Sequence, residues 1–501
     1  MTRRRSAALV AVGVTVVAFA LLVPSTSGKG TDMDEGSVVA YASRVLDGAL
    51  PHRDFLTFYG PANPVLVAGA FAAFDESVAV ERAVGLFYRL VIVLSLFALA
   101  LRLGGLLTAG LAAVVSAWMM SNEIVWAYAT YGSIAFGVLG LLLAAMGADS
   151  DTRRRTEFLY LAFGLACGMA ILMRFDFALA ALASAFPMLT LVPWRIRAWY
   201  VGGLVASAGL YVPHLLLVGW NRVGRLAGDL AATGPQRRLP ILEVDDELGV
   251  LLAGGIVASV GYVALGAVLW RRGGSDVDSR LLTSVGLFCC GLVPWALFRA
   301  DGLHVGPFAV VPLSLLPATA LLLVSRSRVG PRGRLAASVV VALVALFPVV
   351  DDRDAKLGPA RDLRGIRTAY RGFYDDDSRG AKVVVDEVAR LGQPGDSLFV
   401  GPRDLRRADY GPTYMYFLLR DLQPASYYME MNPGTANREG SGLADELRRA
   451  NWLILTTEFE SRTTAAAPLG PSEPNEVVRD LFCPRLEVDQ YALYERCPTT
   501  R

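Results

Sequence analysis

Long apolar runs recur along the first 350 residues, separated by short polar segments. A helix needs about 20 apolar residues, with a range of about 17–25, to cross the hydrocarbon core of a bilayer. By this criterion the pattern predicts about eleven transmembrane helices, over residues 6–24, 83–101, 105–120, 133–148, 158–173, 177–193, 199–219, 248–270, 281–298, 307–324 and 335–350. Residues 61–76 are also apolar, but this run is short and flanked by proline, which favours an interfacial or re-entrant helix over a span.

Beyond residue 350 the long apolar runs stop, and charged residues and turn signals become dense. Periodicity predicts helices over AKVVVDEVARL (381–391) and GLADELRRA (442–450), and strands over DSLFVG (396–401), NWLILTT (451–457) and LEVDQYALYER (486–496). Alternating helices and strands are typical of a small α/β domain. The sequence therefore predicts an α-helical membrane domain over 1–350, including a first loop at 25–82, and a C-terminal α/β domain over 351–501.

Composition agrees with a polytopic membrane protein. Of 501 residues, 54% are hydrophobic and only 19% are charged, whereas soluble proteins have about 25% charged residues. The net charge of +2 gives no basic excess that would indicate nucleic-acid binding. The five cysteines form no C-x-x-C pair and the three histidines are scattered, so no zinc-finger or redox motif is present.

The distribution of Lys and Arg predicts the orientation, because cytoplasmic loops carry an excess of basic residues. Segments 1–5, 102–104, 148–157, 194–198, 271–280 and 325–334 hold 16 Lys and Arg in 43 residues. The opposite set, 25–82, 121–132, 174–176, 220–247 and 299–306, holds 10 in 109. We therefore expect an integral plasma-membrane protein with a cytoplasmic N terminus and an extracytoplasmic C-terminal domain.

The first apolar run has an alternative interpretation. Its basic start and the small residues in PSTSG are also features of a cleaved signal peptide. Because there is no clear A-x-A site and the run is long, a retained anchor is favoured. Under either interpretation the loop that follows faces outward.

The outward loops carry the polar residues that are suited to catalysis or to substrate binding. They are Asp32, Asp34, Glu35, Arg53, Asp54, Tyr59, Glu123, Tyr128, Tyr131, Arg174, Asp176, Arg299, Asp301 and His304. Carboxylates supply a base or metal ligands, and Arg and His suit an anionic headgroup. Sugar transfer from a polyprenyl phosphate needs both, because a base deprotonates the acceptor while cations stabilise the departing phosphate.

The first loop also resembles a known family. Its motif comprises Asp34-Glu35-Gly36, Tyr41, Arg44, Leu46, Gly48, Pro51, Arg53-Asp54-Phe55 and Tyr59-Gly60-Pro61. This pattern is similar to the GT-C glycosyltransferases, in particular the branch of protein O-mannosyltransferases and lipid A aminoarabinose transferases. The segment HVGPFAVVPLSLLP, from His304, is similar to the stretch that opens a late span in that family. In topology the resemblance covers residues 1–350, and its specific motifs lie in the first loop.

The resemblance implies an inverting transfer from a polyprenyl-phosphate-linked sugar to a lipid, polysaccharide or protein acceptor. It assigns Asp34 as the base, with Glu35 supporting it or binding a metal. Arg174, Arg299 and His304 become candidates for the donor phosphate, and Arg53, Asp54, Tyr59, Asp176 and Asp301 for other substrate contacts. No second motif identifies a metal site, so dependence on a divalent cation, held by Asp34 and Glu35 if by any residues, stays open.

Each of these residues also has a purely structural interpretation. Asp34 could cap a helix that starts near Ser37, and Arg53 and Asp54 could form an ion pair within the loop. Arg174 could snorkel at the end of its span, and His304 could satisfy a loop carbonyl. Tyr128 and Tyr131 are more typical of aromatic residues at the membrane interface than of sugar-stacking platforms.

Cys483 and Cys497 both fall in the predicted outer domain, where a disulfide can persist, so we consider this pairing. Cys167, Cys289 and Cys290 lie in spans and are interpreted as packing residues. The outer domain is the expected acceptor-side element, with YGPTYMYF and ASYYMEM as candidate aromatic patches.

Other functions were weighed against sugar transfer. A transporter or lipid flippase predicts polar residues throughout the spans and inverted repeats, but no repeat is evident and Arg89 is the main ionisable residue at a span centre. A non-catalytic scaffold leaves the carboxylate loop without a purpose. Within the enzyme class, an oligosaccharide ligase that uses a diphosphate donor stays open.

Overall fold

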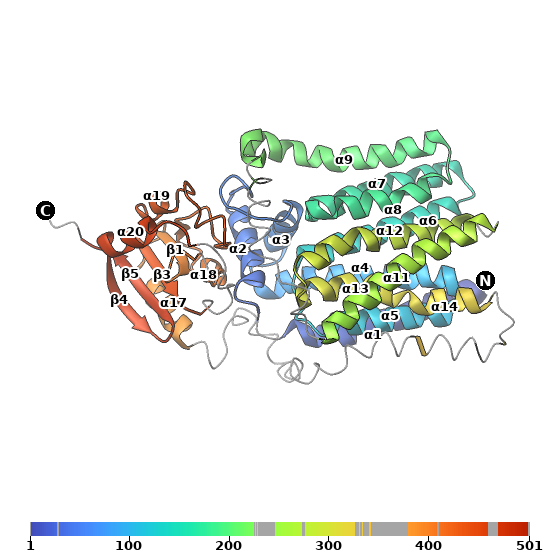
Figure 1. Ribbon diagram of the computed structural model, residues 1–501, viewed down its shortest axis with the longest axis horizontal. Helices are drawn as coiled ribbons and strands as arrows, with labels where there is room; N and C mark the ends of the chain where they lie inside the picture. The colour runs from blue at the N-terminus through green and yellow to red at the C-terminus, as the bar shows by residue number, and fades with distance from the viewer. Residues whose placement is uncertain are drawn as a thin grey trace. The chain divides into compact units, whose positions relative to one another are not determined.

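The computed structural model describes residues 2–27, 30–224, 226, 228, 246–272, 276–325, 330, 333, 340–341, 379–407, 410–458 and 469–498. The chain divides into two compact units (Figure 1). The helical unit comprises Met1–Gly28, Arg82–Pro213 and Leu239–Ile366. The α/β unit comprises Lys29–Glu81, His214–Arg238 and Arg367–Arg501.

Helices that match the predicted spans make up most of the helical unit. They are α1 (Thr2–Leu22), α4 (Val78–Gly104), α5 (Leu106–Ser121), α6 (Ala129–Ala148), α7 (Arg153–Met173), α8 (Ala178–Leu189), α9 (Trp194–Val218), α11 (Asp246–Arg271), α12 (Asp276–Phe298), α13 (Gly302–Ser314) and α14 (Leu316–Ser325). Short 3-10 turns, η1 (Val23–Thr26) and η2 (Phe175–Phe177), follow α1 and α7. Among the described residues, seven helical segments are long and apolar enough to cross a membrane, namely α4, α6, α7, α9, α11, α12 and the stretch Gly302–Val324 that α13 and α14 form together. Shorter apolar helices span Val10–Thr26, Leu106–Ser121 and Phe175–Leu189.

The prediction of a polytopic helical membrane protein is therefore confirmed. Ten of the eleven predicted spans coincide with described helices. The eleventh, 335–350, lies outside the described residues apart from positions 340 and 341. The last described span is broken between α13 and α14, with Pro317 in the first turn of α14, where its missing N–H costs no hydrogen bond.

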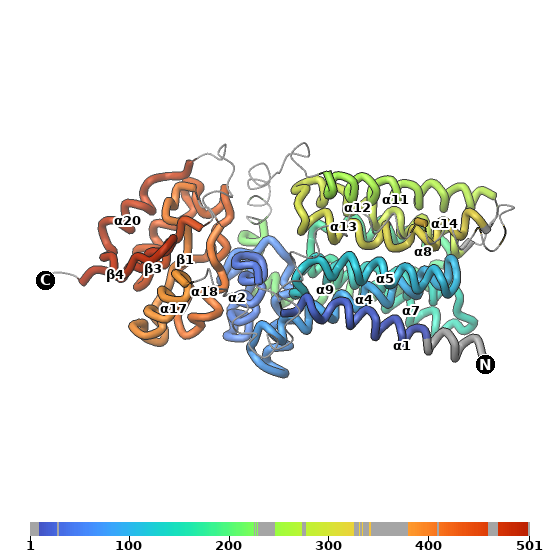
Figure 2. The backbone as a smooth tube through the Cα atoms, turned by 90° about the horizontal axis from the view of Figure 1, so that it is seen from below, coloured from blue at the N-terminus to red at the C-terminus, as the bar shows by residue number. Residues whose placement is uncertain are grey.

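Small residues allow the helices of this unit to approach closely. A Cβ atom on Gly203 of α9 would lie 2.1 Å from the carbonyl oxygen of Leu161 in α7, and a Cβ on Gly164 of α7 would lie 2.0 Å from the carbonyl oxygen of Tyr200. Such contacts are typical of membrane helices, which associate through packing and not through hydrophobic burial. Helices α11 and α12 also pack along each other, as both views of the chain show (Figures 1 and 2).

The α/β unit is built around one mixed five-stranded sheet. Its strands β1 (Ser397–Pro402), β2 (Gln423–Pro424), β3 (Trp452–Thr456), β4 (Phe482–Val488) and β5 (Tyr491–Arg496) lie in the order β2-β1-β3-β5-β4. Strand β1 pairs in parallel with β2 and β3, whereas β5 is antiparallel to β3 and β4. The helices of this unit are α2 (Asp34–Leu46), α3 (Ala62–Ala73), α17 (Arg379–Leu391), α18 (Tyr414–Leu418), α19 (Leu443–Leu447) and α20 (Glu473–Leu481).

The predicted secondary structure of the C-terminal region is largely present, with one correction. The segment LEVDQYALYER forms two strands and not one, because the chain turns at Asp489, whose φ is +50°. Asp tolerates this left-handed conformation better than most residues, so the alternating pattern continues through a tight hairpin turn.

The compact units also differ from the predicted domain division. The sequence placed loop 25–82 with the transmembrane helices, whereas residues 29–81 pack with the C-terminal segment. Leu56 of this loop belongs to the same apolar core as Phe399, Leu447 and Leu453 of the sheet domain. The predicted boundary between residues 350 and 351 lies outside the described residues.

Candidate functional site

Helix α2 begins at the two carboxylates of the family motif. Asp34 and Glu35 occupy its first turn, and Met33 is the N-cap residue. The helix thus starts earlier than predicted, and the interpretation of Asp34 as a cap for a helix near Ser37 is wrong. The Thr31 hydroxyl accepts a hydrogen bond from the Glu35 backbone N–H at 2.8 Å. Asp34 is half-buried and Glu35 is completely buried.

The position after the two carboxylates requires glycine, because the backbone at Tyr414 packs directly against Gly36. A Cβ atom at this position would lie 2.5 Å from the backbone nitrogen of Tyr414, at the start of α18. The Thr413 hydroxyl donates to the Met33 carbonyl at 2.7 Å, and the Ser37 and Thr413 hydroxyls are 3.2 Å apart. These contacts fix the first turn of α2 and therefore the backbone that carries Asp34 and Glu35.

Other motif residues hold the loop against the C-terminal segment. Tyr41 stacks on Phe55 with ring centroids 4.6 Å apart, and its hydroxyl donates to Glu430 at 3.2 Å. Burial, and next the negative charge of Glu430, raise the pKa of Tyr41 well above its usual value, so this phenol stays protonated. Tyr41 and Phe55 are thus packing residues of the α/β unit.

The turn after α2 holds three of the predicted substrate contacts. Arg53 and Asp54 form an ion pair at 2.7 Å. Partial burial raises the pKa of Asp54, but the hydrogen bonds from Arg53 and from the Leu50 backbone outweigh it and lower this pKa overall. The Tyr59 carbonyl lies 3.1 Å from Nε2 of His52, so Tyr59 closes the turn through its backbone, and its side chain is half-buried.

In the helical unit, Arg174 is held by charge and by aromatic rings. Its Nη2 lies 2.7 Å from Asp176, and its Nη1 donates to the Thr130 hydroxyl at 2.9 Å. The guanidinium carbon is 5.1 Å from the ring centroid of Trp295, within cation–π range. Arg174 is only 8% exposed, which argues against a side chain that merely snorkels towards water.

Arg299, Asp301 and His304 form a second group, around the start of α13. The Asp301 carboxylate caps the helix by accepting from the His304 backbone N–H at 3.1 Å, and it lies 2.6 Å from His304 Nδ1. Arg299 Nε donates to the same carboxylate at 2.6 Å. Burial raises the pKa of Asp301, but His304 and Arg299 together lower it, so it is a carboxylate that receives the Nδ1 proton of His304.

The indole of Trp295 joins these two groups. Its ring centroid lies 4.9 Å from that of His304 and 5.1 Å from the Arg174 guanidinium. The structure therefore brings together Arg174, Arg299 and His304, the residues proposed from the sequence for phosphate binding. Each is supported by a carboxylate, Asp176 or Asp301, so these two acids position the cations.

Glu123 and Arg89 belong to the same region, although the sequence gave neither of them a role in the site. Arg89 is completely buried, lies 4.0 Å over the Tyr131 ring and donates to the Trp126 carbonyl at 2.9 Å. The Tyr131 hydroxyl donates to Glu123 at 3.1 Å. A Cβ on Gly306, two residues after His304, would lie 2.8 Å from Glu123. The sequence signal that could have identified Glu123 is its position as a carboxylate directly after an apolar run.

Two interpretations based on aromatic residues are wrong. Tyr128 and Tyr131 are 3% and 1% exposed, so they are core residues and do not form a lipid-facing interfacial belt. The segment YGPTYMYF is also no surface patch, because its side chains Tyr410, Tyr414, Met415, Tyr416 and Phe417 are all buried. In ASYYMEM, Tyr427 is half-buried, whereas Tyr428, Met429 and Met431 are buried.

A metal site finds no support in the described residues. They contain no group of three or more His, Cys, Asp or Glu side chains that could hold an ion. Asp34 and Glu35 are successive residues of a helix, so their side chains point about 100° apart and do not face each other.

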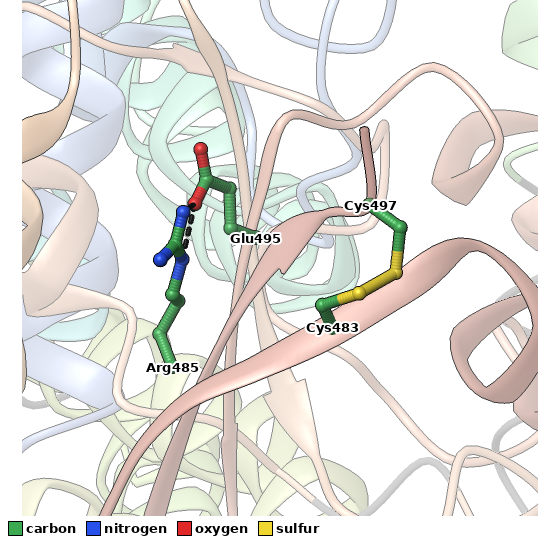
Figure 3. Close-up of a disulfide and its surroundings, with 4 residues drawn as sticks. All are labelled: Cys483, Arg485, Glu495 and Cys497. Atoms are coloured by element: carbon green, nitrogen blue, oxygen red, sulfur yellow. Dashed lines mark hydrogen bonds and ion pairs between the residues drawn. A yellow bond between two sulfur atoms is a disulfide. The ribbon is translucent and has the colours of Figure 1, made fainter. Parts of the chain in front are cut away.

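Cys483 and Cys497 form a disulfide at the outer hairpin of the sheet (Figure 3). The bond joins the start of β4 to the residue after β5, beside the ion pair of Arg485 and Glu495. Closing a loop of this size stabilises a fold by about 3 kcal/mol. Cys167 and Cys289 are buried and Cys290 is partly buried.

Comparison with known proteins gives a match at the level of structure. No protein-family model matches the sequence, and no curated protein matches it. Several crystal structures do match the fold of this chain. The structure of ArnT from Cupriavidus metallidurans bound to undecaprenyl phosphate matches with a TM-score of 0.55 and 14% identity, and the match covers 99% of this chain and 98% of that one. The Archaeoglobus fulgidus oligosaccharyltransferase in complex with Zn and sulfate has a TM-score of 0.55 and 13% identity, covering 98% of this chain and 74% of that one. The same enzyme tethered to an acceptor peptide with the NVT sequon gives a TM-score of 0.51 and 12% identity, covering the same shares of both chains.

These similarities define the fold of the chain. The chain is an integral membrane protein with the GT-C fold, and the fold predicted from the first-loop motif is confirmed. At such low identity the likeness establishes the architecture, and the activity has to be argued from the residues themselves.

Proposed function

We propose that this protein is an inverting glycosyltransferase that moves a sugar from a polyprenyl-phosphate donor to an acceptor hydroxyl. The observation that carries the proposal is the cluster of Arg174, Arg299 and His304, linked through Trp295 and Asp301, in a chain with the GT-C fold. Two arginines and a histidine, with Arg174 paired to Asp176 and both Arg299 and His304 paired to Asp301, suit a phosphate that gains charge as it leaves. The similarity to an ArnT structure that contains undecaprenyl phosphate supports this donor class.

The reaction assigns one role to each group. Asp34 removes the proton from the acceptor hydroxyl, and the oxygen attacks the anomeric carbon from the face opposite the phosphate. The bond between this carbon and the phosphate oxygen breaks, and its electron pair stays on the phosphate. Arg174 and Arg299 stabilise the new charge, His304 contributes a hydrogen bond, and the sugar is delivered with inverted configuration.

Glu35 has a supporting role in this proposal. Its side chain is completely buried in the first turn of α2, where the helix dipole favours negative charge. It thus helps to set the electrostatic environment of Asp34, while the half-exposed Asp34 is the carboxylate that an acceptor can reach. We further propose that Arg53 and Asp54, which line a pocket of the α/β unit, contact the acceptor.

The test compares wild-type protein with Asp34→Asn in reconstituted membranes, using a panel of polyprenyl-phosphate sugars and candidate acceptors, with and without divalent ions. We expect turnover with one donor to fall by about 100-fold or more in the variant, as when a general base is lost. Asp47→Asn is the matched control, because Asp47 is the C-cap residue of the same helix. Its side chain is 52% exposed and forms a surface ion pair with Arg44 at 3.3 Å.

Two outcomes would contradict the proposal. Equal turnover in wild type and Asp34→Asn would remove Asp34 from the role of base. No turnover with any donor would argue against the transferase, and transport of a lipid or solute would become the next function to test.

A further inference from the structure

A polar pocket of about 430 Å³ lies within the α/β unit. Six charged residues line it, namely Arg53, Asp54, Arg222, Arg438, Glu446 and Arg449. Its volume falls in the range of small-ligand sites, about 300–1,000 Å³. None of the residues assigned to the base or to the donor phosphate lines this pocket, so it is a separate feature.

The charge of the pocket favours an anion. Four arginines face two carboxylates, and one of these, Asp54, is already paired with Arg53 at 2.7 Å. The other, Glu446, accepts a hydrogen bond from the Ser426 hydroxyl at 2.7 Å, and burial raises its pKa. The lining therefore keeps a positive excess.

Backbone contacts hold two of the four arginines in place before any ligand arrives. Arg222 donates to the carbonyl of Arg53, and Arg449 Nε donates to the carbonyl of Asp445 at 3.1 Å. Guanidinium groups fixed in this way bind planar carboxylates or phosphates through paired hydrogen bonds with less loss of side-chain entropy.

Aromatic rings lie beside these charges. Tyr427 and Tyr428 also line the pocket, and their hydroxyls donate to the carbonyls of His52 at 3.1 Å and Ser441 at 3.0 Å. Because both phenols are anchored, the rings have fixed orientations. A rigid aromatic face next to hydrogen-bonding groups suits a sugar ring, which has both apolar C–H faces and polar edges.

We propose that this pocket binds a sugar unit that carries a carboxylate or a phosphate, and that the acceptor of the transfer reaction is therefore an anionic saccharide. The second half of this inference rests on the proposed transferase function. The first half, anionic sugar binding, stands on the pocket alone.

The experiment measures binding to purified full-length protein in neutral detergent by calorimetry. Glucuronic acid and glucose 6-phosphate are the anionic sugar probes, and glucose and inorganic phosphate are the reference probes. We expect saturable binding of the two anionic sugars, weaker binding of phosphate and none of glucose. Arg438→Gln and Arg449→Gln should each weaken the anionic sugars about tenfold or more.

Arg479→Gln is the matched control. Arg479 is an exposed arginine of α20 in the same unit, paired with Asp480 at 3.0 Å, and it does not line the pocket. Its replacement should leave binding unchanged. Thermal unfolding of all three variants shows whether each is folded, and the second pocket variant keeps the test decisive if one of them is not.

Several results would overturn the inference. Glucose bound as tightly as glucose 6-phosphate, or affinities unchanged in both pocket variants, would exclude an anionic sugar site. Phosphate bound as tightly as glucose 6-phosphate would reduce the pocket to a simple anion site. If the protein binds phosphatidylglycerol vesicles but no sugar, and Arg449→Gln abolishes the vesicle binding, the pocket would be assigned to an anionic lipid.

The two proposals fail in different ways. Donor turnover that depends on Asp34, without binding of either anionic sugar, would remove this inference and leave the transferase intact. Binding of anionic sugars without turnover of any donor would remove the transferase and leave the pocket assigned.

Discussion

At the scale of single residues, packing explains part of the first-loop motif that resembles the GT-C family. Gly36 admits the backbone at Tyr414, and Tyr41 stacks on Phe55. Of the two carboxylates that open the motif, Glu35 is completely buried and Asp34 is half-buried. A pattern shared with a family therefore identifies the fold more directly than it identifies the catalytic group.

His52 illustrates how such a residue affects stability. It is 1% exposed, its Nδ1 lies 3.2 Å from Nε2 of His214, and burial, followed by the charge of His214, lowers its pKa from 6.5 to about 4. Between pH 6.5 and 4 the unfolded chain binds a proton at this site that the folded chain does not. Stability therefore falls as the pH drops through this window.

We predict that His52→Asn reduces this acid sensitivity. Asn accepts the left-handed backbone of residue 52, whose φ is +66°, and does not titrate. Melting temperatures measured from pH 7 to pH 4 should fall less steeply in the variant than in wild type. Identical slopes would show that His52 does not cause the acid sensitivity.

At the scale of secondary-structure elements, close packing through small residues determines how the helices meet. Gly164 and Gly203 bring α7 and α9 within backbone contact, and Gly137 of α6 makes room for the ring of Phe288 in α12. The apolar pattern predicts each helix but gives no information on which of its faces meets which neighbour.

We predict that Gly203→Ala destabilises the protein by about 1–3 kcal/mol, the usual cost of overpacking. Its new methyl group would meet the Leu161 carbonyl oxygen at 2.1 Å, which forces α7 and α9 apart. Gly202→Ala is the matched control, because the nearest atom to its Cβ is 3.9 Å away. Thermal unfolding in detergent should show a loss only for Gly203→Ala, and equal stability of the two variants would contradict the close approach.

At the scale of the whole molecule, the two units mix segments that are distant in the sequence. Residues 29–81 and the C-terminal segment share one apolar core, so the carboxylate loop is part of the α/β unit. Truncation of the C-terminal segment would therefore remove core contacts of the loop that carries Asp34, and loss of activity in such a truncation would say nothing specific about the acceptor.

The positive-inside pattern predicts that the N terminus is cytoplasmic and the sheet extracytoplasmic. Arg153→Cys and Arg479→Cys place comparable labels in the two regions, because the arginine side chains are 69% and 71% exposed. In intact cells a membrane-impermeant maleimide should label Arg479→Cys, whereas Arg153→Cys should react only after permeabilisation. The reverse pattern would invert the predicted topology.

The sequence by itself determined the features that depend on neighbouring residues. Apolar periodicity predicted ten described helices and the strands β1 and β3, because burial in lipid or in a core imposes a local pattern. The outward loops also contain Arg174, Arg299 and His304, which the resemblance to the GT-C family made candidates for the donor phosphate, and this role stays a prediction. The hairpin at Asp489 was missed because a tight turn hardly interrupts an alternating pattern.

Only the tertiary structure decided what depends on contacts between distant segments. The packing of Thr413 against the first turn of α2, the Trp295 ring between Arg174 and His304, and the gathering of Arg53, Arg222, Arg438 and Arg449 around one pocket each join distant parts of the chain. Such contacts are set by the packing of whole elements, and no local pattern of residues encodes which elements meet.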